Sequence, residues 1–451
     1  MAGRKRPWFS AGGLLMLAAV CGCGSTYRPV VTPINPTGPP AQPSTLIAVV
    51  SQQNAPGASP DPQTAGVATI LDFSGDSILA QAIIGPGPIG FALSPSGGEA
   101  YTINHDQTLS SFPVTSGLMT KNVAVTTLLK STTPGNVLSA VGSVFLADTA
   151  NNEVDYLTGS PVSLKQAIPV GLGPATVVGN SSGQRVYAIS QMLAPNTCNV
   201  PAQNVNGQVY SIESSTNTVS NVLPVGVCPV FGVVSADNRR VFILNRGSGT
   251  VSVIDGQTNQ LNEQTFGSDH KPCTFNCQTF AVGGGPVYAE IYQKASILVT
   301  ANYDSNTVSF IDISTDVFGN NSSTFGNVLA TVSVGNHPST VAVLQDGSRA
   351  YTANQGDGTV SIIDMTSFRV KKVIKVMDQP RSVAAVSNAL IGKVYVTSPT
   401  SPQVTIIRTD TDAITATVQL PGWVVELRAS GQSAGGSNTI NASRTLGSGT
   451  P

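Results

Sequence analysis

Apolar and polar residues alternate over short runs along most of the chain, and one stretch shows the pattern most clearly. Residues 349–376 read RAYTANQGDGTVSIIDMTSFRVKKVIKV. The runs 350–352, 359–364 and 370–376 are rich in Val, Ile, Thr and Tyr, and Gly, Asp, Asn and Ser fill the gaps. β-Branched and aromatic residues in short runs separated by turn residues predict an antiparallel meander.

The same pattern recurs in residues 241–255 (VFILNRGSGTVSVID), 297–312 and 394–420. Recurrence at this length predicts an array of like units. A single four-stranded unit cannot bury both of its faces, so the units must pack against one another. An all-β chain of such units predicts a β-propeller, in which the blades surround a central channel.

Each unit contains four runs, and the propeller order of strands identifies the innermost run of each. Eight innermost runs are predicted: 88–94, 136–142, 174–179, 229–235, 286–292, 338–344, 380–387 and 421–429. The array begins on a second run at Leu46 and stops on an innermost run at 423–429. The two ends should therefore share one blade and remove two exposed sheet edges. We predict eight blades over residues 45–430, with seven as the alternative.

The units at 241–255, 297–335 and 350–376 resemble the YVTN family of β-propeller repeats, which occurs in bacterial and archaeal surface proteins. The resemblance is strong for the last four units and weaker for the first three. It implies the propeller fold without a single activity, because related propellers include lactonases and the haem-binding domains of nitrite reductases. Asn245 and Asp255, with their equivalents in other units, are interpreted as turn-forming residues.

The N-terminus predicts export. Residues 1–22 combine a basic start, Arg4 to Arg6, with a short apolar core, as in a secretory signal. The small residues that follow resemble a bacterial lipoprotein signal, with Cys23 as the lipidated residue and Cys21 as the alternative. Residues 23–44 are Pro-rich and predict a tether, and residues 431–451 predict a disordered tail. We expect lipid anchoring in the cell envelope, in the periplasm or on the outer surface.

Composition excludes one class of partner. Charged residues make up 10% of the chain and the net charge is −1, so nothing favours nucleic acid. Two Trp in the whole chain exclude a Trp-rich quinone-dependent dehydrogenase. We expect a monomer that touches the membrane only through its lipid.

Four cysteines of the exported part lie in or beside insertions between the runs. In an exported protein they predict disulfides, and four cysteines allow three pairings. We favour Cys198–Cys228 together with Cys273–Cys277. A four-thiolate metal site is the alternative, although the C-x3-C spacing and an oxidising compartment oppose it.

Three of the four long insertions are expected on one face of the ring, where the second-to-third turns and the links to the next unit open. These are 51–66, 190–206 and 267–278; the fourth, 315–327, is expected on the opposite face. Insertions that gather on one face indicate a binding surface for a protein, a glycan or a small ligand.

Candidate chemistry is sparse. His105, His270 and His337 are expected on that face, which would allow a metal or haem ligand, as in the related haem-binding propellers. A lactonase-type hydrolase would use a cluster of His337, Glu290 and Arg381 at the channel mouth. No motif supports either activity, and no cofactor is expected. The sequence therefore favours a non-catalytic, lipid-anchored binding scaffold, with the lactonase and the haem or metal carrier as alternatives.

The anchor is testable by labelling cells that express the protein with radioactive palmitate. The wild type should incorporate label, and Cys23→Ala should abolish it because the thioether-forming residue is lost. Cys21→Ala, the neighbouring cysteine, is the control and should keep the label. Labelling that survives Cys23→Ala and is lost in Cys21→Ala would move the anchor to Cys21.

Overall fold

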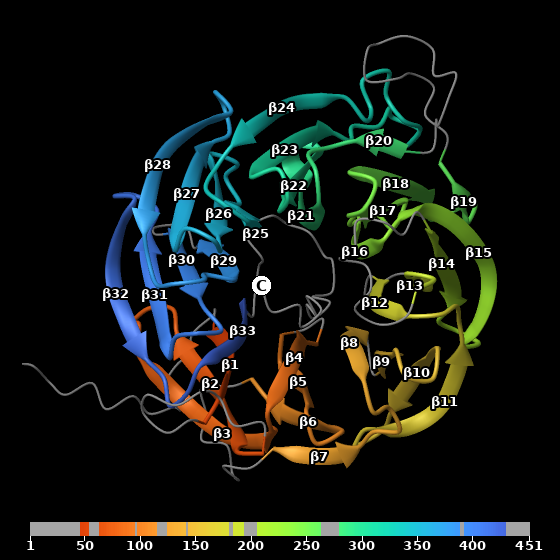
Figure 1. The fold of residues 1–451 in the computed structure, drawn as a ribbon, viewed down its shortest axis with the longest axis horizontal. Coiled ribbons are helices and arrows are strands. Elements are labelled where there is room, and N and C mark those ends of the chain that lie inside the picture. The colour runs from red at the N-terminus through yellow and green to blue at the C-terminus, as the bar shows by residue number, and fades with distance from the viewer. Residues whose placement is uncertain are drawn as a thin grey trace, which may run out of the picture. The chain divides into compact units, whose positions relative to one another are not determined.

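The computed structural model describes residues 46–53, 63–94, 97–114, 124–140, 143–179, 184–193, 205–262, 279–387 and 392–429. These residues belong to one compact unit. Their strands form eight antiparallel sheets arranged in a ring, so the prediction of eight blades is confirmed (Figure 1). No helix among them is long and apolar enough to cross a membrane.

In seven blades the strands run in chain order from the channel to the outside of the ring, and in the closing blade β33 precedes β1, β2 and β3. The innermost strands are β4 (Pro88–Leu93), β8 (Pro134–Ala140), β12 (Pro174–Gly179), β16 (Pro229–Val234), β21 (Pro286–Tyr292), β25 (Pro338–Val343), β29 (Ser382–Ser387) and β33 (Val424–Ala429). The second strands are β1 (Leu46–Gln52), β5 (Glu99–Asn104), β9 (Ser143–Asp148), β13 (Arg185–Ser190), β17 (Arg240–Asn245), β22 (Ile297–Asn302), β26 (Arg349–Asn354) and β30 (Gly392–Thr397).

The outer half of each blade completes the sheet. The third strands are β2 (Ala65–Asp72), β6 (Thr108–Pro113), β10 (Glu153–Thr158), β14 (Asn206–Glu213), β18 (Thr250–Asp255), β23 (Thr307–Asp312), β27 (Thr359–Asp364) and β31 (Gln403–Arg408). The outermost strands are β3 (Ile78–Pro86), β7 (Val125–Leu128), β11 (Ser163–Pro169), β15 (Thr218–Val227), β19 (Gln260–Leu261) with β20 (Thr279–Ala281), β24 (Val328–Ser333), β28 (Arg369–Lys375) and β32 (Ala413–Gln419). A 3-10 turn, η2 (Gln293–Ala295), precedes β22.

One blade departs from the expected pattern. Both β19 and β20 pair with β18, so an insertion divides the outermost strand of this blade. We expected this insertion, 267–278, on the face where the links to the next unit and the second-to-third turns open. It lies instead within the fourth strand, and its own residues fall outside the described part of the chain.

The ring closes through the two ends of the propeller, as predicted. Strand β1 pairs with β33, with Ile47 opposite Ala429 and Val49 opposite Leu427. A second link joins the first and last blades: buried Lys393 on β30 donates to the carbonyl of Phe73 and to Asp76, each at 2.7 Å. The closing blade is therefore held by a sheet ladder and by a charged contact with its neighbour.

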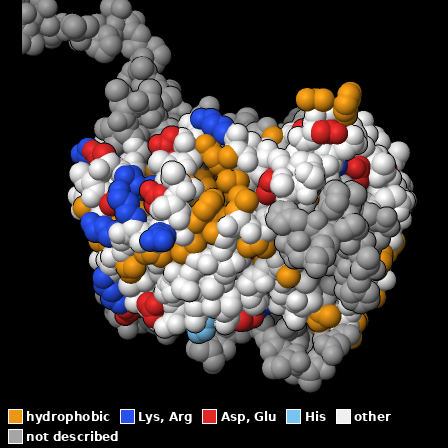
Figure 2. Space-filling model, turned by 90° about the horizontal axis from the view of Figure 1, so that it is seen from above, with side chains coloured by type: hydrophobic (Ala, Val, Ile, Leu, Met, Phe, Trp, Pro, Cys, Tyr) orange, Lys and Arg blue, Asp and Glu red, His pale blue; other side chains and the backbone are white. Residues whose placement is uncertain are grey.

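The core lies between blades, which explains the sequence pattern. The second strand β17 is buried along all six residues, because neighbouring blades cover both of its faces. One apolar cluster combines Ile189, Phe242 and Leu298, which come from three successive blades. The outermost strand β28 alternates and exposes Val373 and its lysines. Figure 2, an edge-on view, shows hydrophobic side chains gathered on this outer wall with Lys and Arg beside them.

A repeated hydrogen-bond set fixes the turn between the second and third strands. Asn245, the last residue of β17, donates from Nδ2 to Thr250 Oγ1 at 3.1 Å and to Ser252 Oγ at 2.9 Å. Its Oδ1 accepts from the backbone of Gly226, which leads into the same blade. The same two side-chain bonds recur at Asn104, Asn302 and Asn354. The interpretation of these asparagines as structural is confirmed.

The aspartates that end the third strands are also structural. Asp255 Oδ1 accepts from the backbone N–H groups of Gln257 and Thr258, and Asp364 Oδ1 does the same for Thr366 and Ser367. These turns open on the face opposite the Asn sets. The insertion 315–327 lies there too, because it joins β23 to β24, as expected.

Ring closure can be tested by truncation. A chain that ends at Leu420 lacks β33 and exposes the edge of β1, whereas a chain that ends at Ala429 keeps every described strand. Losing the buried side chains of Val424 and Leu427 alone should cost about 3 kcal/mol or more. We expect the shorter chain to unfold at a clearly lower temperature or to aggregate. Equal thermal midpoints for the two truncated chains would contradict closure by β33.

Candidate functional site

The links between blades and the second-to-third turns lie on one face of the ring, here called the crossover face. The N–H of the residue after a second strand donates to the carbonyl just before the innermost strand of the same blade. Tyr303 N contacts Gly285 O at 2.8 Å, and Gln355 N contacts His337 O at 2.9 Å. Each link therefore packs against a turn, and side chains from successive blades meet on this face.

The residue before the first proline of an innermost strand often has a left-handed backbone. Glycine fills this position at Gly87, Gly173 and Gly285. His337 fills it in the link to β25, with φ 54°. A left-handed conformation costs a side chain-bearing residue about 1–2 kcal/mol relative to the right-handed form. Cys228, directly before Pro229, has the same conformation with φ 53°, so the position accepts residues other than glycine.

His337 lies flat against Tyr303 of the preceding blade. The two rings are 4.5 Å apart between centroids and only 8° from parallel. The guanidinium carbon of Arg246, one blade further back, lies 5.3 Å from the Tyr303 ring centroid. Asp304 orients that arginine, because its carboxylate accepts from Nη2 at 3.0 Å and from Nε at 3.3 Å. Three successive blades thus contribute to one stacked group.

Arg381, in the link to β29, interacts with this group through its charge. Burial lowers the pKa of its guanidinium, and the charges of Glu426 and Tyr303 act in the opposite direction. Glu426, on β33, also pairs with Arg428 at 2.5 Å. Burial raises the pKa of the Tyr303 hydroxyl, which therefore keeps its proton at neutral pH. We call Arg246, Tyr303, Asp304, His337 and Arg381 the Tyr303 cluster.

The three proposed lactonase residues are only partly brought together. His337 stacks on Tyr303, and the charge of Arg381 acts on the Tyr303 hydroxyl. Glu290 lies four residues along β21 from Pro286, the end of that strand on the crossover face, and a strand rises about 3.3 Å per residue. It therefore lies deeper along the channel wall than the other two.

The remaining sequence candidates are dispersed or fall outside the described residues. His105 is exposed after β5, in a blade remote from His337. His270, Cys198, Cys273, Cys277, Cys21 and Cys23 are outside the described part of the chain. Cys228 is buried and takes part in a disulfide bond, whose partner is also outside it. The pairing, the lipid site and a three-histidine metal site stay predictions.

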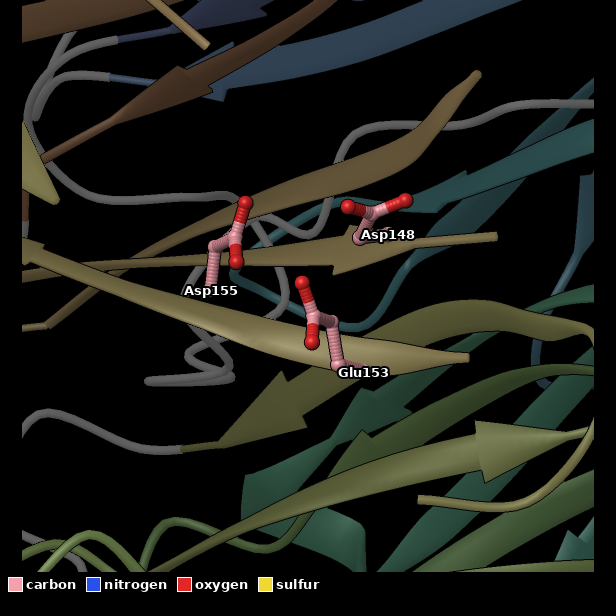
Figure 3. A group of neighbouring side chains, drawn as sticks. All are labelled: Asp148, Glu153 and Asp155. Atoms are coloured by element: carbon pink, nitrogen blue, oxygen red, sulfur yellow. The ribbon is translucent and has the colours of Figure 1, made fainter. Parts of the chain in front are cut away.

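A second group of side chains was not anticipated from the sequence. Asp148, Glu153 and Asp155 place one carboxylate oxygen each within 4.8 Å of the others, and all three are buried. Figure 3 shows the three carboxyl groups turned toward a common space between β9 and β10. We call them the carboxylate trio.

The three carboxylates of the trio differ in their hydrogen-bond and ion-pair partners. Asp148 accepts from Ser131 Oγ, from the backbone N–H groups of Ala150 and Asn151, and from the Asn151 side chain. Glu153 pairs with Lys130. Asp155 is 1% exposed, and neither of its oxygens has a hydrogen-bond partner among the described residues. Burial first, and then the charges of Asp148 and Glu153, raise the pKa of Asp155 to about 7.

A signal for the trio does exist in the sequence. Asp148 pairs with Glu153 as Asn245 pairs with Thr250. Asp155 then stands at the position of Ser252. A residue-by-residue comparison of the units shows acids where another blade has an amide and two hydroxyls. The general pattern of strands and turns does not show this difference.

The comparisons with known proteins agree with the fold and do not extend beyond it. No family model matches the chain, and no curated protein matches its sequence, so the resemblance to YVTN repeats stays a prediction. Apo AztD from Citrobacter koseri is 14% identical with a TM-score of 0.55, and the match covers 86% of this chain and 98% of that one.

Two further solved structures are similar at the same level. The dihydro-haem d1 dehydrogenase NirN is 12% identical with a TM-score of 0.60, covering 88% of this chain and 76% of that one. A putative 6-phosphogluconolactonase from Bacteroides fragilis is 13% identical with a TM-score of 0.53, covering 87% and 99%. The chain is thus a β-propeller, a fold whose similar structures carry the names of different activities.

The backbone strain at His337 can be measured with two variants. His337→Gly and His337→Ala both lose the ring and its stacking on Tyr303, so the difference between them isolates the backbone. Glycine accepts φ 54° freely and alanine does not, so the Gly variant should be more stable by about 1 kcal/mol in denaturant unfolding. An Ala variant as stable as the Gly variant would mean that no strain is stored there.

Proposed function

We propose that this protein is an exported, lipid-anchored, non-catalytic β-propeller of the YVTN type that binds its ligand at the Tyr303 cluster. The ligand class that fits this cluster is an organic acid whose carboxylate or phosphate is attached to a ring. The observation that carries the proposal is the parallel stack of His337 on Tyr303, with Arg246 and Arg381 beside it.

The cluster offers two kinds of contact. Its exposed histidine and partly exposed tyrosine present ring surface, and ring stacking is worth about 0.5–1.5 kcal/mol for an aromatic partner. Guanidinium groups recognise carboxylate and phosphate through paired N–H donors. Across the cluster and the adjacent pair on β33, three arginines face two carboxylates, Asp304 and Glu426. Asp357, which accepts from Asn336 beside His337, brings the count to three charges of each sign, so recognition of an anion rests on the guanidinium donors and not on net charge.

The same contacts favour binding over hydrolysis. General-base catalysis needs a carboxylate or imidazole free to take a proton from water or substrate. Asp304 is held by Arg246, and Glu426 is paired with Arg428. Glu290, the carboxylate proposed for a lactonase, lies deeper along the channel wall. Asp357, next to the link that carries His337, is also held, by the backbone N–H and the side-chain amide of Asn336.

The remaining support concerns display of the site. A ring closed by its own termini provides a rigid platform, and a Pro-rich tether after a lipidated cysteine would hold that platform away from the membrane. The disulfide at Cys228 is consistent with an oxidising compartment. Cys228 also precedes β16 in a link of the crossover face, next to Arg246, whose backbone N–H donates to its carbonyl.

Binding is tested by calorimetry with matched probe pairs: glucuronate against glucose, and benzoate against benzyl alcohol. We expect the acidic member of at least one pair to bind and its neutral partner to bind at least tenfold more weakly. Tyr303→Ala should weaken binding of the acid by about tenfold, because the stacking surface is lost. Phe318→Ala is the matched control, since Phe318 is an aromatic residue that is 79% exposed on the opposite face.

The outcomes separate the proposals. Failure of both acids to bind, or equal loss of affinity in Tyr303→Ala and Phe318→Ala, would reject the Tyr303 cluster as the binding site. Turnover of a panel of sugar lactones that is lost in His337→Ala would instead support the hypothesis of a lactonase.

A further inference from the structure

One blade, β8 to β11, differs from its neighbours at five matching positions around a single turn. In four other blades, those that begin with β4, β16, β21 and β25, the link into the blade carries an aliphatic residue and a glycine, as in Val225 and Gly226, and the turn carries Asn, Thr and Ser. This blade carries, in the same order, Lys130, Ser131, Asp148, Glu153 and Asp155. All five replacements add a charge or a polar oxygen, and all five side chains are linked through contacts or charge.

The replacement removes the donor on which the turn depends elsewhere. Asn245 Nδ2 joins two hydroxyl groups in its blade, but Asp148 has no N–H group to offer Glu153 or Asp155. Ionised carboxylates only accept hydrogen bonds. The consequence is visible at Asp155, which is buried with both oxygens unpartnered among the described residues. Burying an unpaired ionised carboxylate is costly, so Asp155 either takes up a proton or is paired with a bound positive group.

We propose that Asp148, Glu153 and Asp155 form a divalent cation site, and that its ion is calcium. This site is independent of the Tyr303 cluster, which is built on β17 to β29 in other blades (Figure 1). The three carboxylates supply up to six oxygen atoms and no nitrogen or sulfur, which is the donor set of a hard cation.

Coordination geometry favours calcium among the hard cations. The three ligand oxygens lie within 4.8 Å of one another. Two oxygens on opposite sides of Ca²⁺ lie about 4.6–5.2 Å apart, since each bond is about 2.3–2.6 Å. For Mg²⁺ the corresponding separation is about 4.2 Å, and the ion demands near-octahedral geometry. Separations below 4.8 Å are compatible with both ions, but Ca²⁺ accepts irregular geometry and Mg²⁺ does not, so oxygens held in fixed positions by two strands favour Ca²⁺.

The net charge of the site also favours a divalent cation. Three carboxylates and one ammonium, Lys130, leave a net charge of −2 if all are ionised. One divalent cation neutralises the group. Ser131 adds a hydroxyl oxygen beside Asp148, at 2.7 Å, where other links carry glycine without a side chain.

The test uses the purified full chain, stripped with EDTA and dialysed into chelator-free buffer. Titration with CaCl₂ in a calorimeter should show one saturable site with a dissociation constant of about 1 mM or tighter. Calcium at ten times that constant should raise the thermal midpoint by about 2 °C or more, because it binds only the folded chain. MgCl₂ at the same concentration should raise it less.

Three variants locate the effect. Asp155→Asn should lose at least tenfold in calcium affinity. The triple variant Asp148→Asn, Glu153→Thr, Asp155→Ser installs the residues of the other blades, so it should fold without calcium and show no calcium-dependent shift. The control variant Asp106→Asn, Asp237→Asn, Asp346→Asn removes three exposed carboxylates and should keep the full shift.

The outcomes are decisive in either direction. A calcium-dependent shift in the wild type and the control variant that disappears in the triple variant supports the site. No saturable calcium binding to the wild type, a shift that survives the triple substitution, or a response to ZnCl₂ but not to CaCl₂ would each overturn it. Because the triple variant restores a hydrogen-bonded turn, its midpoint in EDTA should equal or exceed that of the wild type, which separates loss of binding from loss of folding.

Discussion

The structure depends on burial of both faces of every sheet. A blade such as β16 to β20 places apolar side chains on each face of its middle strands, and only the two neighbouring blades cover them. An open row of blades would leave two apolar faces and two sheet edges in water. Pairing of β1 with β33 removes this problem in one step, because it makes the first and the last units of the chain neighbours.

This constraint also explains how the crossover face is organised. Each blade must be held at a fixed angle to the next, and the links between blades do so by hydrogen-bonding to the second-to-third turn. Side chains of the links and turns are therefore positioned by backbone contacts that do not depend on what those side chains are. His337 and Asp148 occupy two such positions, at which Gly285 and Asn245 stand in other blades.

The sequence predicted the fold well because the fold follows from short-range residue patterns that repeat along the chain. Eight units, their strand order and the shared blade at the ends follow from where Val, Ile and Thr alternate and where turns fall. The divided strand β19 and β20 was not predicted, because two and three residues carry too little periodicity to be recognised. Contacts between residues of different blades are harder to predict from the sequence. Tyr303 and His337 are 34 positions apart, and they meet only because of the angle between neighbouring blades. The trio was missed for a different reason, since its acids fit the strand pattern and differ only in chemistry.

The meeting of β1 and β33 has one more consequence. Because the last strand of the chain is the inner neighbour of the first, the ring has no structural beginning. A circular permutant that joins the two ends of the propeller by a linker and opens the chain at another solvent-exposed turn would therefore keep every sheet intact. The order in which the blades are synthesised is therefore not what determines the fold.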